Sequence, residues 1–148
     1  MDESRFLIVG AYGQLGKALQ AKYPKAVAVD RDTFDMTDWG MIQGYDWSKF
    51  DVILNAAAYT NVDGAETAEG RPLAWKINAT GPGYLSRIAT EHELTLVHIS
   101  SEYVFDGTKN PKSTVTWRCS PRASSVCRRL PQINLLSDAF IAADFPPA

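Results

Sequence analysis

Three glycines at three-residue spacing are the first residues in this sequence whose pattern implies chemistry. Gly10, Gly13 and Gly16 follow an apolar run at 6–9 and lead into a helix-forming segment. Such glycines permit a sharp turn, a close approach of backbone to a pyrophosphate, and tight packing of a helix on a strand. The start of that helix offers free N–H groups to phosphate. The pattern predicts a site for a dinucleotide diphosphate; the alternative is a strand-turn-helix unit that binds nothing.

An acidic residue stands at the spacing from these glycines that a nucleotide ribose requires. Asp30 follows the apolar run 26–29, twenty positions after Gly10. Its carboxylate can accept hydrogen bonds from the ribose hydroxyls, which favours NAD, whereas Arg31 can pair with a 2′-phosphate, which favours NADP. The sequence leaves the choice between NADH and NADPH open, and Asp30 can also be a solvated acid at a strand end.

The elements that must position these residues alternate along the chain. We predict strands at 5–9, 26–29, 51–54 and 94–99, and helices at 14–23 and 71–92, the second kinked at Pro82. Thr37 or Asp38 can cap a short helix that reaches Ile42. Short apolar strands between helices predict a Rossmann-like α/β fold, a doubly wound parallel sheet covered on both faces, truncated to four clear strands in the order 3-2-1-4.

Ligands of doubly wound sheets lie beyond the carboxyl ends of the strands, at the switch point. With the predicted order, that point lies between the first and fourth strands. Small or polar residues follow each strand, and those after the third are Ala56, Ala57 and Ala58. They let a flat cofactor lie against backbone, or simply form a tight core turn. After the fourth strand, Ser101 can donate to a developing alkoxide, or cap a turn.

The amino-acid composition limits the kinds of partner that this chain is expected to bind. The chain has 148 residues, 45% of them hydrophobic, and a net charge of −2. No basic excess calls for nucleic acid, and no apolar run reaches the ~18 residues of a membrane span. Cys119 and Cys127 form no zinc set, and residues 1–4 lack the basic start of a secretory signal. We expect a cytoplasmic protein with no metal site, no nucleic-acid partner and no membrane partner.

Five sequence blocks follow one another along residues 5–111. They are Gly10-x-x-Gly13-x-x-Gly16, Asp35-Met36-Thr37-Asp38, Asn55-Ala56-Ala57-Ala58-Tyr59-Thr60, Asn78-Ala79-Thr80-Gly81-Pro82 and Ile99-Ser100-Ser101-Glu102-Tyr103-Val104-Phe105-Asp106-Gly107. In this order they resemble the extended short-chain dehydrogenase/reductase superfamily, and within it the dTDP-4-dehydrorhamnose reductases.

The resemblance implies a reductase that uses NADPH or NADH to reduce the C4 ketone of a dTDP-sugar in dTDP-rhamnose biosynthesis. Ser101 would polarise the ketone, and Glu102 and Tyr103 would flank the substrate. Asn78 would support the site from the long helix. The implied cofactor contacts are Gly10, Gly13, Gln14, Leu15 and Gly16 at the pyrophosphate, Asp30 and Arg31 at the ribose, Asp35 and Met36 at the adenine, and Ala56, Ala57, Ala58 and Tyr59 along the cofactor, with Asn78 beside them.

The tyrosine and lysine that protonate the alkoxide in this superfamily are missing at the expected place. No tyrosine follows Tyr103 in the sequence. Tyr45 and Lys49 have the right spacing, but they precede the third strand, so we reject them as a catalytic pair. This chain alone is therefore expected to be weakly active or inactive, and a non-catalytic NAD(P)-binding regulatory module is the alternative. A damaged domain that binds nothing is a third reading.

The last part of the chain differs from the rest. Residues 1–111, which we interpret as a partial NAD(P)-binding Rossmann domain, carry 10 basic and 15 acidic residues; residues 112–148 carry 5 and 2. We interpret 112–148 as an atypical tail, a frame-shifted or truncated remnant. If this tail adds no strand, the fourth strand leaves a bare sheet edge that favours homo-oligomers.

Overall fold

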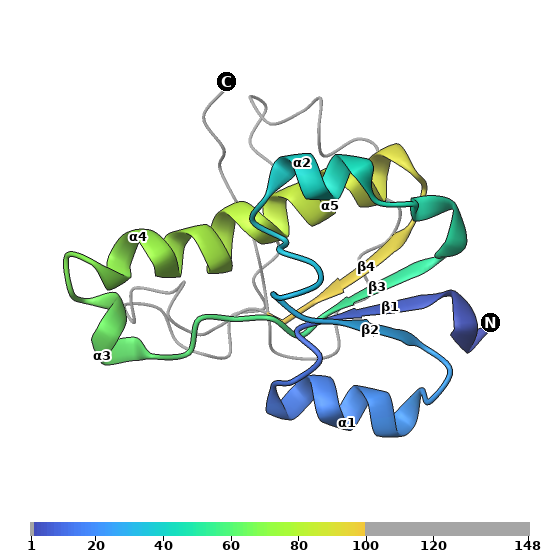
Figure 1. Cartoon of the computed structure of the whole chain (residues 1–148), viewed down its shortest axis with the longest axis horizontal. Helices are drawn as coiled ribbons and strands as arrows, with labels where there is room; N and C mark the ends of the chain where they lie inside the picture. Colours follow the sequence, from blue (N-terminus) through green and yellow to red (C-terminus); the bar gives the residue numbers. More distant parts are fainter. Residues whose placement is uncertain (1, 100–148) are drawn as a thin grey trace, which may run out of the picture.

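The computed structural model describes residues 2–99, and these form a parallel four-stranded sheet with helices on both faces (Figure 1). The strands lie in the order β2-β1-β3-β4. Their bounds are β1 Phe6–Val9, β2 Val27–Val29, β3 Val52–Asn55 and β4 Thr95–His98. The Rossmann-like α/β class and all four strand positions predicted from the sequence are confirmed.

The predicted strand order 3-2-1-4 is wrong. The third strand pairs with the first on the side away from β2, with Phe6 opposite Val52 and Val9 opposite Asn55. All four residues of β3 are buried, whereas only Val29 of β2 is. A uniformly apolar strand needs cover on both faces and a neighbour on each side, so β3 takes the central place and β2 the edge.

Two separate apolar clusters hold the helices to the sheet. Helix α1 (Gln14–Lys22) covers one face through Leu19 and Tyr23, which pack on Phe6 and Ile8. Helices α2 (Trp39–Gly44) and α5 (Gly81–Glu91) cover the other face (Figure 1). There the buried residues include Leu7, Val9, Phe34, Ile42, Ile53, Leu85 and Ile88. Cover on both faces was predicted and is confirmed.

The long helix predicted at 71–92 is present, but its irregular part lies before Pro82. It runs as α4 (Gly70–Trp75), a π-helical segment η3 (Lys76–Thr80) and then α5. Pro82 has no N–H, and its ring excludes the carbonyl four residues earlier, so the preceding turn widens. Figure 1 shows α4 extending past the carboxyl ends of the strands.

Short elements complete the described part. They are η1 (Glu3–Arg5), η2 (Trp47–Lys49) and α3 (Val62–Ala65). The predicted cap of α2 is Asp38, whose carboxylate accepts the N–H groups of Gly40 and Met41. Within residues 2–99, no helix combines the length and the apolar character needed to cross a membrane.

Candidate functional site

Successive strands are added on one side of β1 and then on the opposite side, beyond β3. This change between β1 and β3 determines where the candidate site lies. From β1 the chain moves outward to β2, and from β3 it moves the other way to β4. A ligand crevice in such sheets opens where neighbouring strands lead to opposite sides. The switch point is therefore between the first and third strands, not between the first and fourth as the predicted order implied.

The glycine turn at this point is shaped by direct contact with the loop after β3. Gly10 has φ of +82°, and a Cβ there would lie 2.6 Å from the Ala57 nitrogen and 2.7 Å from its Cα. A Cβ at Gly16 would overlap the Gly10 carbonyl oxygen. Both positions need glycine for the fold itself.

Gly13 differs from its two neighbours. A Cβ at Gly13 would stand 3.5 Å from the Gly10 carbonyl oxygen, an ordinary contact. Gly13 is the N-cap of α1 and provides no side-chain cap for the first turn of that helix. Protein packing thus leaves room at Gly13, next to amide groups that can receive an anion.

A pocket of about 270 Å³ opens at this edge of the sheet. Small-molecule sites usually measure about 300–1,000 Å³, so residues 2–99 enclose part of a ligand site of ordinary size. Nine of the fourteen predicted cofactor residues line it. They are Gly10, Gly13, Asp30, Arg31, Asp35, Met36, Ala56, Ala57 and Ala58.

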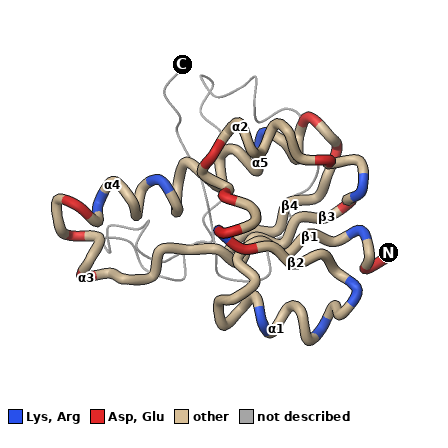
Figure 2. The backbone as a smooth tube through the Cα atoms, in the orientation of Figure 1, with Lys and Arg blue, Asp and Glu red and all other residues tan. Residues whose placement is uncertain are grey.

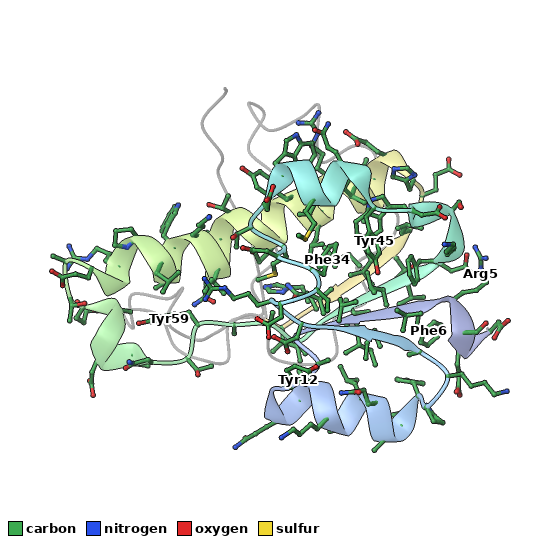
Figure 3. All side chains as sticks on the ribbon, viewed as in Figure 1. Arg5, Phe6, Tyr12, Phe34, Tyr45 and Tyr59 are labelled. Carbon is green, nitrogen blue, oxygen red and sulfur yellow. The ribbon has the colours of Figure 1, made fainter. Side chains whose placement is uncertain are left out.

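Asp30 ties the end of β2 to the glycine turn. One carboxylate oxygen accepts the Tyr12 N–H at 2.8 Å, and the other accepts the Arg31 N–H at 2.8 Å. Figure 3 shows Tyr12 beside the start of α1. Asp30 therefore lines the pocket and also shapes it, since its carboxylate is already bound by backbone donors.

Asp35 is held in its ionised form on the pocket wall. Burial alone would raise the pKa of this carboxyl, but the Thr37 hydroxyl and amide both donate to it, at 2.6 and 2.8 Å. These hydrogen bonds, with the positive charges of Lys76 and Arg31, bring the pKa below its usual value. Acidic and basic residues gather in the loops at this end of the sheet (Figure 2).

The sequence did not point to Lys76 as a pocket residue. Lys76 lines the pocket together with Leu73 and Ile77, because α4 and η3 overhang the carboxyl edge of the sheet. Leu73 and Ile77 share a helical repeat typical of core residues, yet Leu73 is 37% exposed. Within residues 2–99, neither the Lys76 ammonium nor the Arg31 guanidinium forms an ion pair.

Five predicted cofactor residues do not line the pocket. Gln14, Leu15 and Gly16 form the first turn of α1 beside it. The Asn78 side chain accepts the Tyr59 N–H at 2.8 Å and donates to the Tyr59 carbonyl at 3.0 Å. Asn78 thus clamps the loop after β3 to the long helix, and Figure 3 shows Tyr59 in that loop, between the sheet and α3.

A polar pair joins the ends of β3 and β4 directly below the pocket loop. Asn55, only 3% exposed, lies 2.8 Å from His98 (Nδ2 to Nδ1) and accepts the Ala57 N–H at 3.1 Å through Oδ1. Burial lowers the pKa of His98 to about 4. His98 is therefore neutral near pH 7.

Three predicted residues, Ser101, Glu102 and Tyr103, lie outside the described part of the chain. Neither residue of the rejected pair lines the pocket. Tyr45 packs on Phe34 and stacks on Phe50, with centroids 4.9 and 5.9 Å apart. Lys49 pairs with Asp46 at 3.1 Å. Tyr45 is a core aromatic residue.

The parallel sheet, its cover on both faces and the glycine turn at its switch point define a Rossmann-like α/β protein. Comparison of the sequence with known families matches residues 4–124 to the family described as RmlD substrate binding domain. Because this match covers most of the chain, the chain belongs to that family.

Named relatives agree with this membership. A dTDP-4-dehydrorhamnose reductase of Mycobacterium tuberculosis is 40% identical over 107 residues, which are 70% of this chain and 34% of the relative. One from Aggregatibacter actinomycetemcomitans is 40% identical over 116 residues, covering 74% and 38%. This chain spans about a third of the length of these curated relatives.

Solved structures of dTDP-4-dehydrorhamnose reductases are also similar to this chain. The dTDP-4-dehydrorhamnose reductase of Bacillus anthracis, in complex with NADP, has a TM-score of 0.63 and 35% identity, covering 71% of this chain and 38% of that one. The Clostridium acetobutylicum orthologue has a TM-score of 0.67 and 33% identity, covering 84% and 46%.

Proposed function

We propose that this chain forms the NAD(P)H-binding part of an enzyme similar to dTDP-4-dehydrorhamnose reductase. The observation that carries the proposal is the closure of the Ala57 loop on Gly10 at the switch point, which forms a small-residue pocket beside the first turn of α1. The membership of the family and the NADP complex of the Bacillus anthracis relative support it.

The residues present suit a dinucleotide. Gly13 leaves space where the diphosphate would meet the first turn of α1, near Gln14, Leu15 and Gly16. Ala56, Ala57 and Ala58 leave a flat wall for the cofactor, with Tyr59 held behind them. Asp30 and Arg31 stand where the adenosine ribose would lie, and Asp35 and Met36 at the adenine. Within residues 2–99, no side chain fills this space.

The pocket charges support NADPH over NADH. Both acids are already bound by protein donors: Asp30 by two backbone N–H groups, and Asp35 by Thr37. The two cations, Arg31 and Lys76, have no ion pair within residues 2–99. Two cations without an ion pair in the described part of the chain favour a ligand that carries the extra 2′-phosphate.

For the reaction, a dTDP-sugar ketone is the proposed substrate. A reduced nicotinamide held in the pocket would supply a hydride, and residues of the protein would then stabilise and protonate the alkoxide. Ser101 lies three residues after His98 in the sequence and is proposed to donate to that oxygen, with Glu102 and Tyr103 beside the sugar. No Tyr-x-x-x-Lys follows Tyr103 in this sequence, so the sequence after Tyr103 does not contain the pair that protonates the alkoxide in related enzymes.

A non-catalytic NAD(P)-binding module is the second candidate. The absence of that tyrosine and lysine pair favours it, because a general acid contributes about 10²–10⁴ in rate. Both candidates share the pocket and differ only in turnover. We further propose a cytoplasmic location, and homo-oligomers formed through the β4 side of the sheet.

The deciding experiment titrates the full chain with NADPH and NADH and follows the nucleotide fluorescence. Gly13→Val should abolish binding and keep the helical circular dichroism, because only ligand space is filled. Gly44→Val is the matched control, since a Cβ at Gly44 meets nothing within 4 Å. Binding that survives Gly13→Val would reject the proposed diphosphate site.

A second measurement separates the two candidates. We would follow NADPH oxidation with dTDP-4-dehydrorhamnose as the substrate. Turnover that Ser101→Ala lowers supports the reductase. Dinucleotide binding without turnover supports the regulatory module.

A further inference from the structure

We propose that Asn55 and His98 are a positioning pair, in which the His98 ring holds the Asn55 amide in the one orientation that keeps Ala57 against Gly10 and the cofactor pocket formed. This inference rests on the proposed function, because the effect we expect is on dinucleotide binding. Neither residue touches the proposed ligand; both would act through the Ala57 backbone.

The amide orientation follows from its two partners. The Ala57 N–H can only donate, so the Asn55 atom 3.1 Å from it must be the oxygen Oδ1. The atom 2.8 Å from His98 Nδ1 is then the amide nitrogen Nδ2, which can only donate. His98 Nδ1 must therefore accept, and the ring must carry its proton on Nε2.

This series of hydrogen bonds ends at the Ala57 backbone, which forms part of the pocket wall. The bond to Asn55 turns the Ala57 N–H back toward the end of β3, while the Ala56 N–H donates to the Val9 carbonyl at 2.9 Å. These two bonds set the path of the loop over Gly10, where a Cβ would lie 2.6 Å from the Ala57 nitrogen. A loop that lost the Asn55 bond could move away from Gly10 and change the pocket wall.

Protonation of His98 would break the arrangement. An imidazolium carries a proton on Nδ1, which would face the Nδ2 protons of Asn55, two donors with no acceptor. The amide would then flip, and Ala57 would lose its acceptor. Burial opposes this by lowering the pKa of His98 to about 4, so the ring stays neutral in the cell's pH range.

The first test reads the ring directly. Nitrogen NMR of the full chain reports which ring nitrogen carries the proton, and the sequence has only two histidines, so His92→Gln assigns the spectrum. We expect His98 with the proton on Nε2 from pH 5 to pH 8. A proton on Nδ1 would overturn the proposal without any variant of the pair.

The second test moves the ring proton. In Asn55→Asp the introduced carboxylate still accepts the Ala57 N–H, but it cannot donate to Nδ1. The neutral ring can then carry its proton on Nδ1 and donate it to the carboxylate. Nitrogen NMR at pH 8 should therefore find the His98 proton moved from Nε2 to Nδ1, and NADP⁺ affinity by calorimetry should stay within about threefold of wild type.

A His98 proton that stays on Nε2 in Asn55→Asp contradicts the positioning role, and so does an affinity that falls about tenfold although the proton has moved to Nδ1.

Variants at His98 provide the rescue. In His98→Asn the new amide oxygen can accept from Asn55, and affinity should stay within about threefold of wild type. His98→Leu has no acceptor, and affinity should fall about tenfold. His92→Leu is the matched control, since His92 is exposed at the end of α5.

These outcomes separate the two proposals. A wild-type chain that binds no NADP⁺ rejects the proposed function. A wild-type chain that binds, with His98→Leu folded and equally tight, rejects only the positioning pair. If His98→Leu does not fold, the position of the His98 ring proton in Asn55→Asp decides.

Discussion

At the residue scale, the glycines of the first turn have different physical roles. Gly10 combines a positive φ with contact to Ala57, and Gly16 lies against the Gly10 carbonyl, so both are required by packing. Gly13 has an ordinary φ, and a Cβ there would make only an ordinary contact with the Gly10 carbonyl oxygen. The sequence pattern predicted a turn, an approach to pyrophosphate and a helix contact, and the three-dimensional contacts show that packing requires glycine at Gly10 and Gly16.

This difference predicts opposite effects of the same substitution. Gly10→Ala should lower the free energy of unfolding by about 2–4 kcal/mol, from backbone strain and the overlap with Ala57. Gly13→Ala should change it by less than about 1 kcal/mol, yet weaken NADPH binding. Urea denaturation and nucleotide titration measure the two effects, with Gly44→Ala as the control. Equal stability losses at Gly10 and Gly13 would contradict the packing argument.

At the element scale, the π-helical segment η3 places two polar side chains on the site. Asn78 reaches the loop after β3, and Lys76 reaches the pocket. A π turn shifts the helix face relative to a regular α-helix, and such turns are frequent at functional sites. Pro82, which prevents a regular ladder here, therefore influences the site from outside it.

The Asn78 clamp should be measurable. Asn78→Leu removes two hydrogen bonds to the Tyr59 backbone, each worth about 1 kcal/mol at most because the site is exposed. We expect a loss of about 1–2 kcal/mol in the free energy of unfolding, and faster hydrogen exchange of the Tyr59 amide. Asn61→Leu, which removes the cap of α3 nearby, is the control for a general loss of helix capping. Unchanged exchange at Tyr59 would argue against a clamp.

The side chain of Lys76, the other polar residue that η3 places at the site, is expected to affect the choice between NADPH and NADH. Lys76→Met should weaken NADPH binding about three- to fivefold and leave NADH binding nearly unchanged, as expected for an exposed charge interaction. The difference should shrink at high salt. Lys22→Met, at the far end of α1, should affect neither ligand. An equal loss for both nucleotides would mean that Lys76 does not sense the 2′-phosphate.

At the scale of the whole molecule, buried His98 links stability to pH. Its pKa falls from 6.5 to about 4 on folding. Between pH 4 and pH 6.5, His98 binds more protons in the unfolded chain than in the folded one. The free energy of unfolding therefore increases with pH over this range, and the effect of His98 is complete above about pH 6.5. The contribution is at most about 3 kcal/mol, from 1.36 kcal/mol per pKa unit.

The corresponding prediction compares wild type with His98→Asn. Wild type should lose stability as the pH falls from 7 to 4.5, and His98→Asn should lose less over the same range. The carboxylates with lowered pKa, such as Asp35 and Asp51, also lose their contribution at low pH, but they do so in both proteins. Urea midpoints at several pH values measure the difference. Parallel pH curves would contradict the assigned state of His98.

The sequence predicted much of this site because its signals are local. Gly10, Asp30 and Ala57 each follow an apolar strand, and parallel strands end at the same edge of a sheet, so their meeting could be expected. Lys76 and the pairing of Asn55 with His98 could not be found this way. Lys76 belongs to a helix whose overhang depends on its packing, and the pair joins residues 43 positions apart.

What the sequence by itself determined is the set of elements and the residues at their ends. Periodicity, glycines and caps act within a few residues, so the four strands and α1 were predicted correctly, and the cap of α2 was narrowed to Thr37 or Asp38, of which the structure has Asp38. The order of the strands and the switch point between β1 and β3 were decided only by the tertiary structure, which also showed at which of the three glycines packing leaves no room for a side chain. Those features depend on which faces are buried against each other, and burial is a property of the assembled sheet and its helices.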